Sequence, residues 1–348
     1  MTLTRRHVLK TAAGACAGAT LFGTGSLLSR PAQAAQTFTG VTYLPPSYKA
    51  LTYGSAGFVD FLRDNGGDAL EVDFYDSGQL LKVDEQLPAL RSRNIDFMFH
   101  TTSYITRSLP ILGITGLPGV VGELYRNPER LALGSPLFTL INEELAKENL
   151  YMLTSGGGIL EPEYIWSTAA SPVRSLEQLR GKKVRVVSFE ATSALEAYDI
   201  GAVRIPSSET YMALQRGTVD AGVFNISTII GRSLQEQVSV CYQLPITGFS
   251  VAPFMLRDRW DGLDDASREI LTQAAQWYDT NFISHCNDDI YPNEYWPQVR
   301  AENVEVVDPS DEDLAAFNEA THRIWEEWKG EVGADVGERA IALALGKA

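Results

Sequence analysis

A single arginine within an apolar segment is the residue of this chain whose chemistry is easiest to interpret. Arg185 stands between Val184 and Val186, in a segment typical of a buried β-strand. A buried guanidinium needs a partner, because burial of an unpaired charge is very unfavourable. A ligand carboxylate matches the planar fork of arginine, whereas an internal Asp or Glu would form a structural ion pair instead. Arg185 is therefore the principal candidate for carboxylate binding, with the ion pair as the alternative.

Two residues at the end of another predicted strand are candidates for the same site. Phe224 and Asn225 follow the apolar segment Val219–Val223. Ligands of α/β sheets bind in the crevice beyond the carboxyl ends of the strands, so an amide or an aromatic ring at this point would face that crevice. The alternative for Asn225 is a turn-forming role, which asparagine also favours.

A polar cluster follows the predicted strand Ile95–Phe99. It contains His100, Thr101 and Tyr104 within the run His-Thr-Thr-Ser-Tyr. Hydroxyl groups there could bind the far side of a ligand, whereas threonine and serine could instead cap the next helix. Weaker candidates for the wall of the site, on the same argument, are Tyr43, Phe189 and Phe249.

The motifs of common enzyme classes are missing from the sequence. There is no Gly-x-Ser-x-Gly, no His-Glu-x-x-His, no phosphate loop and no dinucleotide fingerprint. The run from His285 to Asp289 could suggest a metal site, but on a helix its side chains would spread around the axis, whereas zinc ligands converge on one point. We therefore expect no catalysis, no metal and no cofactor.

The elements that would position these residues alternate between strand and helix. The first part predicts strands at 36–43, 70–75 and 95–99 and helices at 48–65 and 83–93. The middle repeats the pattern with strands at 183–187, 202–206 and 219–223 and helices at 191–198 and 209–216. Further strands are expected at 150–153, 164–168 and 250–256, and further helices at 128–149, 264–289 and 310–348. Two such units predict an α/β protein of two lobes with a ligand cleft between them.

Composition and charge restrict the class of partner. The chain has 348 residues, 45% of them hydrophobic, which is typical of a globular protein with about two lobes. Its formal net charge is −15. Nucleic-acid binding requires clustered Lys and Arg, and no such cluster follows residue 30. We therefore expect no nucleic-acid partner.

The N-terminus has the pattern of an export signal. Arg5 and Arg6 stand within Thr-Arg-Arg-His-Val-Leu-Lys and precede an apolar, glycine-rich stretch, and Ala32-Gln33-Ala34 has the small-x-small pattern of a cleavage site. Residues 1–34 are therefore predicted to be a twin-arginine signal peptide, with a retained membrane anchor as the alternative. After cleavage we expect a periplasmic protein with no membrane insertion, in which Cys241 and Cys286 are buried and unpaired rather than joined in a disulfide.

Several segments together resemble the solute-binding proteins of TRAP (tripartite ATP-independent periplasmic) transporters, of the dicarboxylate-binding type. The most informative is Glu209–Ala221, which is similar to the family pattern Glu-x-Tyr-x-Ala-Leu-Gln-x-Gly-x-Val-Asp-Gly/Ala and which adds Tyr211 to the candidate ligand-binding residues. The resemblance covers nearly all of residues 36–330, and its other segments are Ser77–Leu80, Leu87–Arg91, Ile95–Phe97 and Val173–Val186.

The resemblance implies a periplasmic receptor, without catalysis, whose two lobes close on a small organic acid. It implies a long helix crossing both lobes, delivery to a pair of membrane permease subunits, and a role for Arg185 in clamping the substrate carboxylate. Several relatives carry a second carboxylate-binding arginine where Tyr164 and Trp166 stand here. These two aromatic residues could line the cleft or could be plain strand core. The family's usual Glu before Asn225 is also missing, which argues against a cation-bridged substrate.

These observations give an expected organisation and function. Lobe I would comprise residues 35–158 and about 248–285, and lobe II residues 159–247 and about 286–348. Hinges are expected near Thr154–Gly158 and Pro245–Gly248. The protein is expected to be a monomer that captures a small organic carboxylate, with Arg107 or Arg204 as substitutes for the missing second arginine. The alternatives are an exported hydrolase-like enzyme that uses the cleft and a binding module that serves a sensor.

Overall fold

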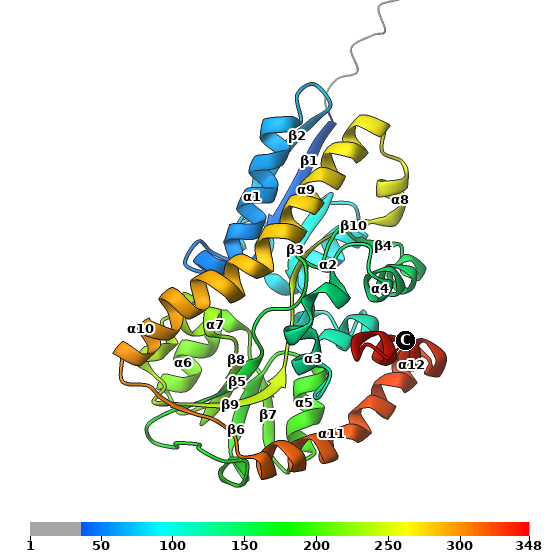
Figure 1. Ribbon diagram of the computed structural model, residues 1–348. Helices are drawn as coiled ribbons and strands as arrows, with labels where there is room; N and C mark the ends of the chain where they lie inside the picture. The colour runs from blue at the N-terminus through cyan, green and yellow to red at the C-terminus, as the bar shows by residue number, and fades with distance from the viewer. Residues whose placement is uncertain (1–35, 348) are drawn as a thin grey trace, which may run out of the picture. The chain divides into compact units, whose positions relative to one another are not determined.

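The computed structural model describes residues 36–347, and the predicted signal peptide at 1–34 lies outside this range. The described chain contains two β-sheets flanked by helices (Figure 1). The predicted α/β fold with two sheet-centred lobes is therefore confirmed. Within residues 36–347, no helix is long and apolar enough to cross a membrane.

The first sheet has the strand order β2-β1-β3-β10-β4. β1 is parallel to both β2 and β3, and β10 runs antiparallel to β3 and β4. The strands are β1 (Gln36–Thr42), β2 (Leu70–Tyr75), β3 (Phe97–Thr101), β4 (Leu150–Met152) and β10 (Val251–Leu256). β3 is central and all five of its residues are buried, which explains its continuous apolar run and leaves its polar end, Thr101, inside the protein.

Helices with an apolar stripe cover this first sheet. In α1 (Lys49–Asn65), Leu51, Phe58, Val59 and Leu62 recur at helical spacing and are buried. α2 (Val83–Arg91), α4 (Pro136–Lys147) and α8 (Arg257–Asp261) also contact strands of this sheet. α12 (Ala334–Ala344) packs on α4, and α3 (Val121–Arg126) contacts a strand of the second sheet. A 3₁₀ helix, Thr102–Tyr104, directly follows β3 and carries part of the predicted polar cluster.

The second sheet has the strand order β11-β9-β5-β8-β6-β7. Its strands are β5 (Glu163–Ser167), β6 (Lys183–Val186), β7 (Gly201–Arg204), β8 (Ala221–Phe224), β9 (Val240–Thr247) and β11 (Glu305–Val307). β6 is parallel to β7 and β8, whereas β5 is antiparallel to β8 and β9. The associated helices are α5 (Phe189–Glu196), α6 (Thr210–Gln215), α7 (Ile226–Gly231) and α11 (Asp311–Val332).

A long helical segment links the surroundings of the two sheets. It begins with α9 (Asp265–Ser284), continues through a π-helix (His285–Tyr295) and ends with α10 (Trp296–Ala301). In Figure 1, α9 is drawn in yellow and lies alongside α1. The helical run continues in orange and there reaches α7, which is green. The segment corresponds to the predicted long crossing helix.

The C-terminal helices also contact both parts of the fold. α11 packs on α5 beside the second sheet, and the indole of Trp328 donates a hydrogen bond to the Pro110 carbonyl on the other side. α12 packs on α4, where Arg130 donates to the Ala344 carbonyl at 2.9 Å. These contacts attach the tail to the helices of the first sheet as well as to those of the second.

Most predicted elements are present, with two informative differences. The predicted helix 128–149 is interrupted, because Ser135 caps α4 through the Phe138 N–H and Pro136 begins a new helix there. The sequence did not predict β9, because Pro245 lies inside it. The strand tolerates this proline because the β5–β9 ladder is irregular between Glu163 and Ile165. Cys241 and Cys286 are buried and unpaired, as predicted.

Candidate functional site

Arg185 lies on β6 in the middle of the second sheet. Its register neighbours are Val203 on β7 and Gly222 on β8. Gly222 has no side chain, and a Cβ there would lie only 2.2 Å from the ring of Phe224. The glycine thus lets the Phe224 ring lie against the sheet, with its centroid 4.7 Å from the Arg185 guanidinium.

The Arg185 side chain is buried but lacks a counter-ion. Only 2% of the residue is exposed. Its Nε donates to the Ile205 carbonyl and its Nη1 to the Val223 carbonyl, both at 2.9 Å. Among residues 36–347, Nη2 has no hydrogen-bond partner and no Asp or Glu forms an ion pair with this arginine. The structural ion pair that was the alternative is therefore not formed within the described chain, and a buried positive charge points into the site with one edge of its fork unused.

A small chamber lies in front of this guanidinium, and we call it the Arg185 chamber. Tyr43, Thr101, Ser103 and Tyr104 line it from the first-sheet side. Glu163, Arg185 and Ser207 line it from the second-sheet side, and Phe249 and Val187 add apolar wall. Its free volume is about 20 Å³, about the space of one water molecule.

Two polar groups of the Arg185 chamber lack partners. Glu163 Oε2 and Ser103 Oγ are buried and make no hydrogen bond within the described residues. Burial raises the pKa of Glu163 to about 7, although the charge of Arg185 and the backbone of Asn225 act in the opposite direction. The chamber thus contains a cation, a carboxyl group whose pKa is raised by burial, and a hydroxyl group without a partner.

Direct contacts connect the two sides around the chamber. The Tyr104 hydroxyl accepts a hydrogen bond from the Ser207 N–H at 3.0 Å, and the Thr106 hydroxyl donates to Glu190 at 3.0 Å. Burial raises the pKa of Glu190 to about 7. On the outer edge, Arg204 forms an ion pair with Asp84 at 3.6 Å. These contacts join the two sides around the chamber.

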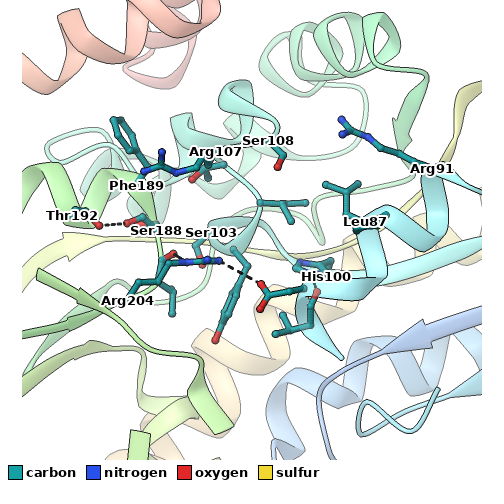
Figure 2. A pocket seen from close by; sticks show the side chains of 17 residues that line it. Leu87, Arg91, His100, Ser103, Arg107, Ser108, Ser188, Phe189, Thr192 and Arg204 are labelled. Carbon is teal, nitrogen blue, oxygen red and sulfur yellow. Dashed lines mark hydrogen bonds and ion pairs between the residues drawn. The ribbon is translucent and has the colours of Figure 1, made fainter. Parts of the chain in front are cut away.

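A larger cavity of about 400 Å³ adjoins the chamber, and we call it the Arg107 cavity. Figure 2 shows Arg107 beside Phe189, and Arg204 with its ion pair drawn as a dashed line. The Arg107 guanidinium lies 5.4 Å from the centroid of the Phe189 ring. Ser103, Tyr104 and Val187 line this cavity as well as the Arg185 chamber, so the two spaces are neighbours.

The structure brings part of the predicted site together. Thr101, Tyr104, Tyr43 and Phe249 all line the Arg185 chamber with Arg185 itself. His100 and Phe189 line the Arg107 cavity instead, as do Arg107 and Arg204. Burial lowers the pKa of His100 although its ring nitrogens lie 3.0 and 3.1 Å from the Thr101 and Val83 carbonyls.

Other predicted residues lie outside the lining of the Arg185 chamber. Asn225 uses its amide internally: it caps α7 through the Ser227 N–H and donates to the Glu161 carbonyl at 2.6 Å. Phe224 lies behind the guanidinium rather than in the lining.

The predicted aromatic residues are also engaged elsewhere. The Trp166 ring stacks on Trp296 and its indole N–H donates to the Phe224 carbonyl, and the Tyr164 ring is tilted against the same tryptophan. The Tyr211 hydroxyl donates to Glu236 near the surface.

Sequence reasoning missed several residues of the chamber. Glu163 and Ser207 contribute polar groups, and Tyr48 and Thr228 complete the wall, whereas Ser103 belongs to the predicted polar cluster after β3. The only sequence signal for Glu163 is an acidic residue directly before the predicted strand 164–168. Over residues 36–347, no three His, Cys, Asp or Glu side chains are grouped so that they could hold a metal ion.

Comparison with known proteins identifies the family. Residues 47–331 match the bacterial extracellular solute-binding proteins of family 7, and the chain belongs to this family. The resemblance to TRAP solute-binding proteins is thereby confirmed. Members of the family are receptors that bind solutes outside the cytoplasm.

Individual relatives are distant in sequence. A solute-binding protein of Albidiferax ferrireducens is 26% identical over 175 residues, 48% of each chain. The ectoine-binding periplasmic protein TeaA of Halomonas elongata is 22% identical over 80% of this chain and 82% of its own length. This chain spans only about half to two thirds of the length of the first curated relatives that it matches.

Solved structures confirm the fold. An extracytoplasmic solute receptor of Bordetella pertussis that binds pyroglutamic acid aligns with a TM-score of 0.79 at 16% identity, over 89% of this chain and 99% of the receptor. A TRAP periplasmic solute-binding protein of Rhodoferax ferrireducens with bound malonate aligns with a TM-score of 0.74 at 18% identity, over 90% of this chain and 98% of the other.

Proposed function

We propose that this protein is a periplasmic receptor that captures a small organic carboxylate and delivers it to the membrane permease subunits of a TRAP transporter. The observation that carries the proposal is the buried Arg185, which has an unused fork edge and no counter-ion among residues 36–347. A ligand carboxylate supplies both the missing negative charge and the missing acceptors. The protein acts as a binder, without a catalytic step, and works as a monomer after removal of residues 1–34.

The arginine count favours a monocarboxylate. Arg185 is the one arginine that lines the Arg185 chamber. Arg204 is engaged by Asp84, and Arg107 lies against Phe189 in the neighbouring cavity. A second carboxylate in the chamber would meet Glu163 rather than a second guanidinium. Among the structural neighbours, one binds pyroglutamic acid and another holds malonate, and a single guanidinium suits the one carboxylate of the first ligand better than the two of the second.

Capture requires opening of the chamber. We propose that lobe I (35–158 and about 248–285) and lobe II (159–247 and about 286–348) move about hinges near Thr154–Gly158 and Pro245–Gly248. Opening would break the Tyr104–Ser207 and Thr106–Glu190 hydrogen bonds and leave the β-sheets intact. Small-angle scattering should show compaction when the ligand is added. An unchanged profile at saturating ligand would contradict hinge closure.

A thermal-shift screen of organic acids on the mature protein tests the proposed function. A ligand that binds only the folded form, present at about 100 times its Kd, adds about 2.7 kcal/mol of stability. We expect at least one carboxylate to raise the melting temperature, with 1:1 stoichiometry by calorimetry and no turnover of the acid. Absence of any stabilising carboxylate, or conversion of the bound acid to a product, would overturn the proposal.

A further inference from the structure

The Arg185 chamber is also lined by Glu163, an acidic residue. Glu163 is only 3% exposed and its Oε2 has no hydrogen-bond partner within residues 36–347. The Ser103 hydroxyl, also 3% exposed, is likewise without a partner there. Both residues line the same chamber as Arg185, and they approach it from opposite sheets. Buried polar atoms are nearly always hydrogen-bonded in folded proteins, so two such atoms in one chamber indicate a polar ligand.

Glu163 and Arg185 enter the chamber from different strands of the second sheet. Glu163 begins β5, directly before the irregularity in the β5–β9 ladder, and is opposite Thr247 in register. Arg185 reaches the chamber from β6, on the other side of β8. No ion pair links the two residues, although the charge of Arg185 lowers the pKa of Glu163 against the larger effect of burial. The chamber therefore presents a positive and an acidic group at separate points.

We infer that the ligand is a monocarboxylate that also bears an N–H donor, with its carboxylate on Arg185 and its N–H facing Glu163 Oε2. The inference rests on the proposed function and specifies a second polar group of the ligand, in addition to its carboxylate. An ammonium or lactam nitrogen carries N–H but no acceptor lone pair, so this atom can donate to Glu163 without needing a second partner. A ligand ammonium also balances the charge of the ionised carboxylate, whereas a second ligand carboxylate would be repelled.

Pairs of acids that differ only at the donor test this inference on the wild-type protein. L-proline is compared with tetrahydrofuran-2-carboxylate, and pyroglutamate with 5-oxotetrahydrofuran-2-carboxylate. In the full panel, each N–H acid is paired with the acid that has oxygen in place of N–H, and malonate represents the dicarboxylates. We expect the tightest acid of the panel to carry N–H and to bind roughly ten- to a hundredfold tighter than its counterpart, the contribution of one hydrogen bond to a charged group.

The outcomes of the panel separate the two proposals. If the oxygen counterpart or malonate binds as tightly as the N–H acids, the donor inference is overturned and the carboxylate receptor stands. If no carboxylate binds, the proposed function is overturned, and the inference fails with it. Because the comparison uses the wild-type protein, it does not depend on whether a variant folds.

Two glutamates of the same strand region provide a matched pair of variants. Glu161 is also buried, and burial raises its pKa to about 7, but its carboxylate accepts from the Trp296 indole and does not line the chamber. Glu163→Gln should weaken the best N–H acid roughly ten- to a hundredfold and leave its oxygen counterpart nearly unchanged. Glu161→Gln should change both affinities by less than about threefold. An equal loss for both acids in Glu163→Gln, or the same selective loss in Glu161→Gln, would overturn the role of Glu163.

Discussion

The Tyr104 hydroxyl accepts a hydrogen bond from the backbone N–H of Ser207 at 3.0 Å, and this bond joins the two sides of the Arg185 chamber. Tyr104 belongs to the 3₁₀ helix that follows β3, and Ser207 follows β7 of the other sheet. Tyr104 lines both the Arg185 chamber and the Arg107 cavity. One side chain therefore forms part of the wall and also holds the closed form together.

Replacing Tyr104 with phenylalanine should weaken ligand binding without removing the wall. The variant keeps the ring but loses the acceptor for Ser207, and a hydrogen bond of this kind contributes about 0.5–1.5 kcal/mol. Since the bond exists only in the closed form, we expect a two- to tenfold increase in Kd by calorimetry. Tyr198→Phe is the control, because its hydroxyl donates to the Ala316 carbonyl away from the chamber. Equal effects of the two variants would contradict the assignment.

The stability of the ligand-free protein should fall as the pH rises through the acidic range. Burial raises the pKa of Glu190 from its ordinary value of 4.5 to about 7. Between these two values the folded state keeps a proton that the unfolded chain releases, so the free energy of unfolding decreases with rising pH and levels off above about pH 7. Glu161 and Glu163 act in the same direction.

Glu190→Gln should flatten this dependence. The amide is neutral at every pH and has nearly the same shape, so the variant should gain up to about 3 kcal/mol relative to wild type at pH 8 and little at pH 4.5. Urea unfolding at the two pH values measures the difference. Two results would contradict this explanation: a wild-type free energy of unfolding that rises from pH 5 to pH 7, or a Glu190→Gln variant with the same pH dependence as the wild type.

Gly157 should be far less tolerant of a side chain than another glycine with similar backbone angles. Gly157 has φ +88°, and a Cβ there would lie 2.2 Å from the Asp279 carbonyl of α9. Gly181 has φ +71° with no neighbouring heavy atom within 4 Å of such a Cβ. Both alanine variants carry backbone strain, but only Gly157→Ala adds a steric clash. We expect its melting temperature to be at least ~5 °C below that of Gly181→Ala. Similar values would show that the contact with α9 is not tight.

The sequence predicted the parts of the site that follow from simple rules. Arg185 was identified because its neighbours are apolar, and Thr101 and Tyr104 because they follow a buried strand. Both rules depend on local pattern and on the general geometry of α/β sheets. The same local pattern could not distinguish a ligand-binding asparagine from a capping one, and Asn225 caps α7.

Glu163 could not be predicted because its orientation depends on tertiary structure. If the side chains of β5 alternated strictly, the register would determine on which face of the sheet the Glu163 side chain lies. The ladder between β5 and β9 is irregular at this point, and β9, which contains Pro245, was not predicted. Whether a strand carboxylate faces a chamber or the surface is decided by which strand lies beside it. That neighbour is 84 residues away along the chain, at Thr247, and no local pattern identifies it.

The most direct test of the role of Arg185 compares the ligand affinity of Arg185 variants with that of an Arg107 variant. The affinities are measured by calorimetry with the acid that gives the largest thermal shift. We predict a ten- to hundredfold loss for Arg185→Lys, because a charged hydrogen bond contributes about 1.5–3 kcal/mol and lysine lacks the planar fork, and a larger loss for Arg185→Ala. Arg107→Ala should remain within about threefold of wild type, because its guanidinium lies against Phe189 in the neighbouring cavity. Near-native affinity in a folded Arg185→Ala, with the large loss in Arg107→Ala, would contradict the account and place the carboxylate in the Arg107 cavity.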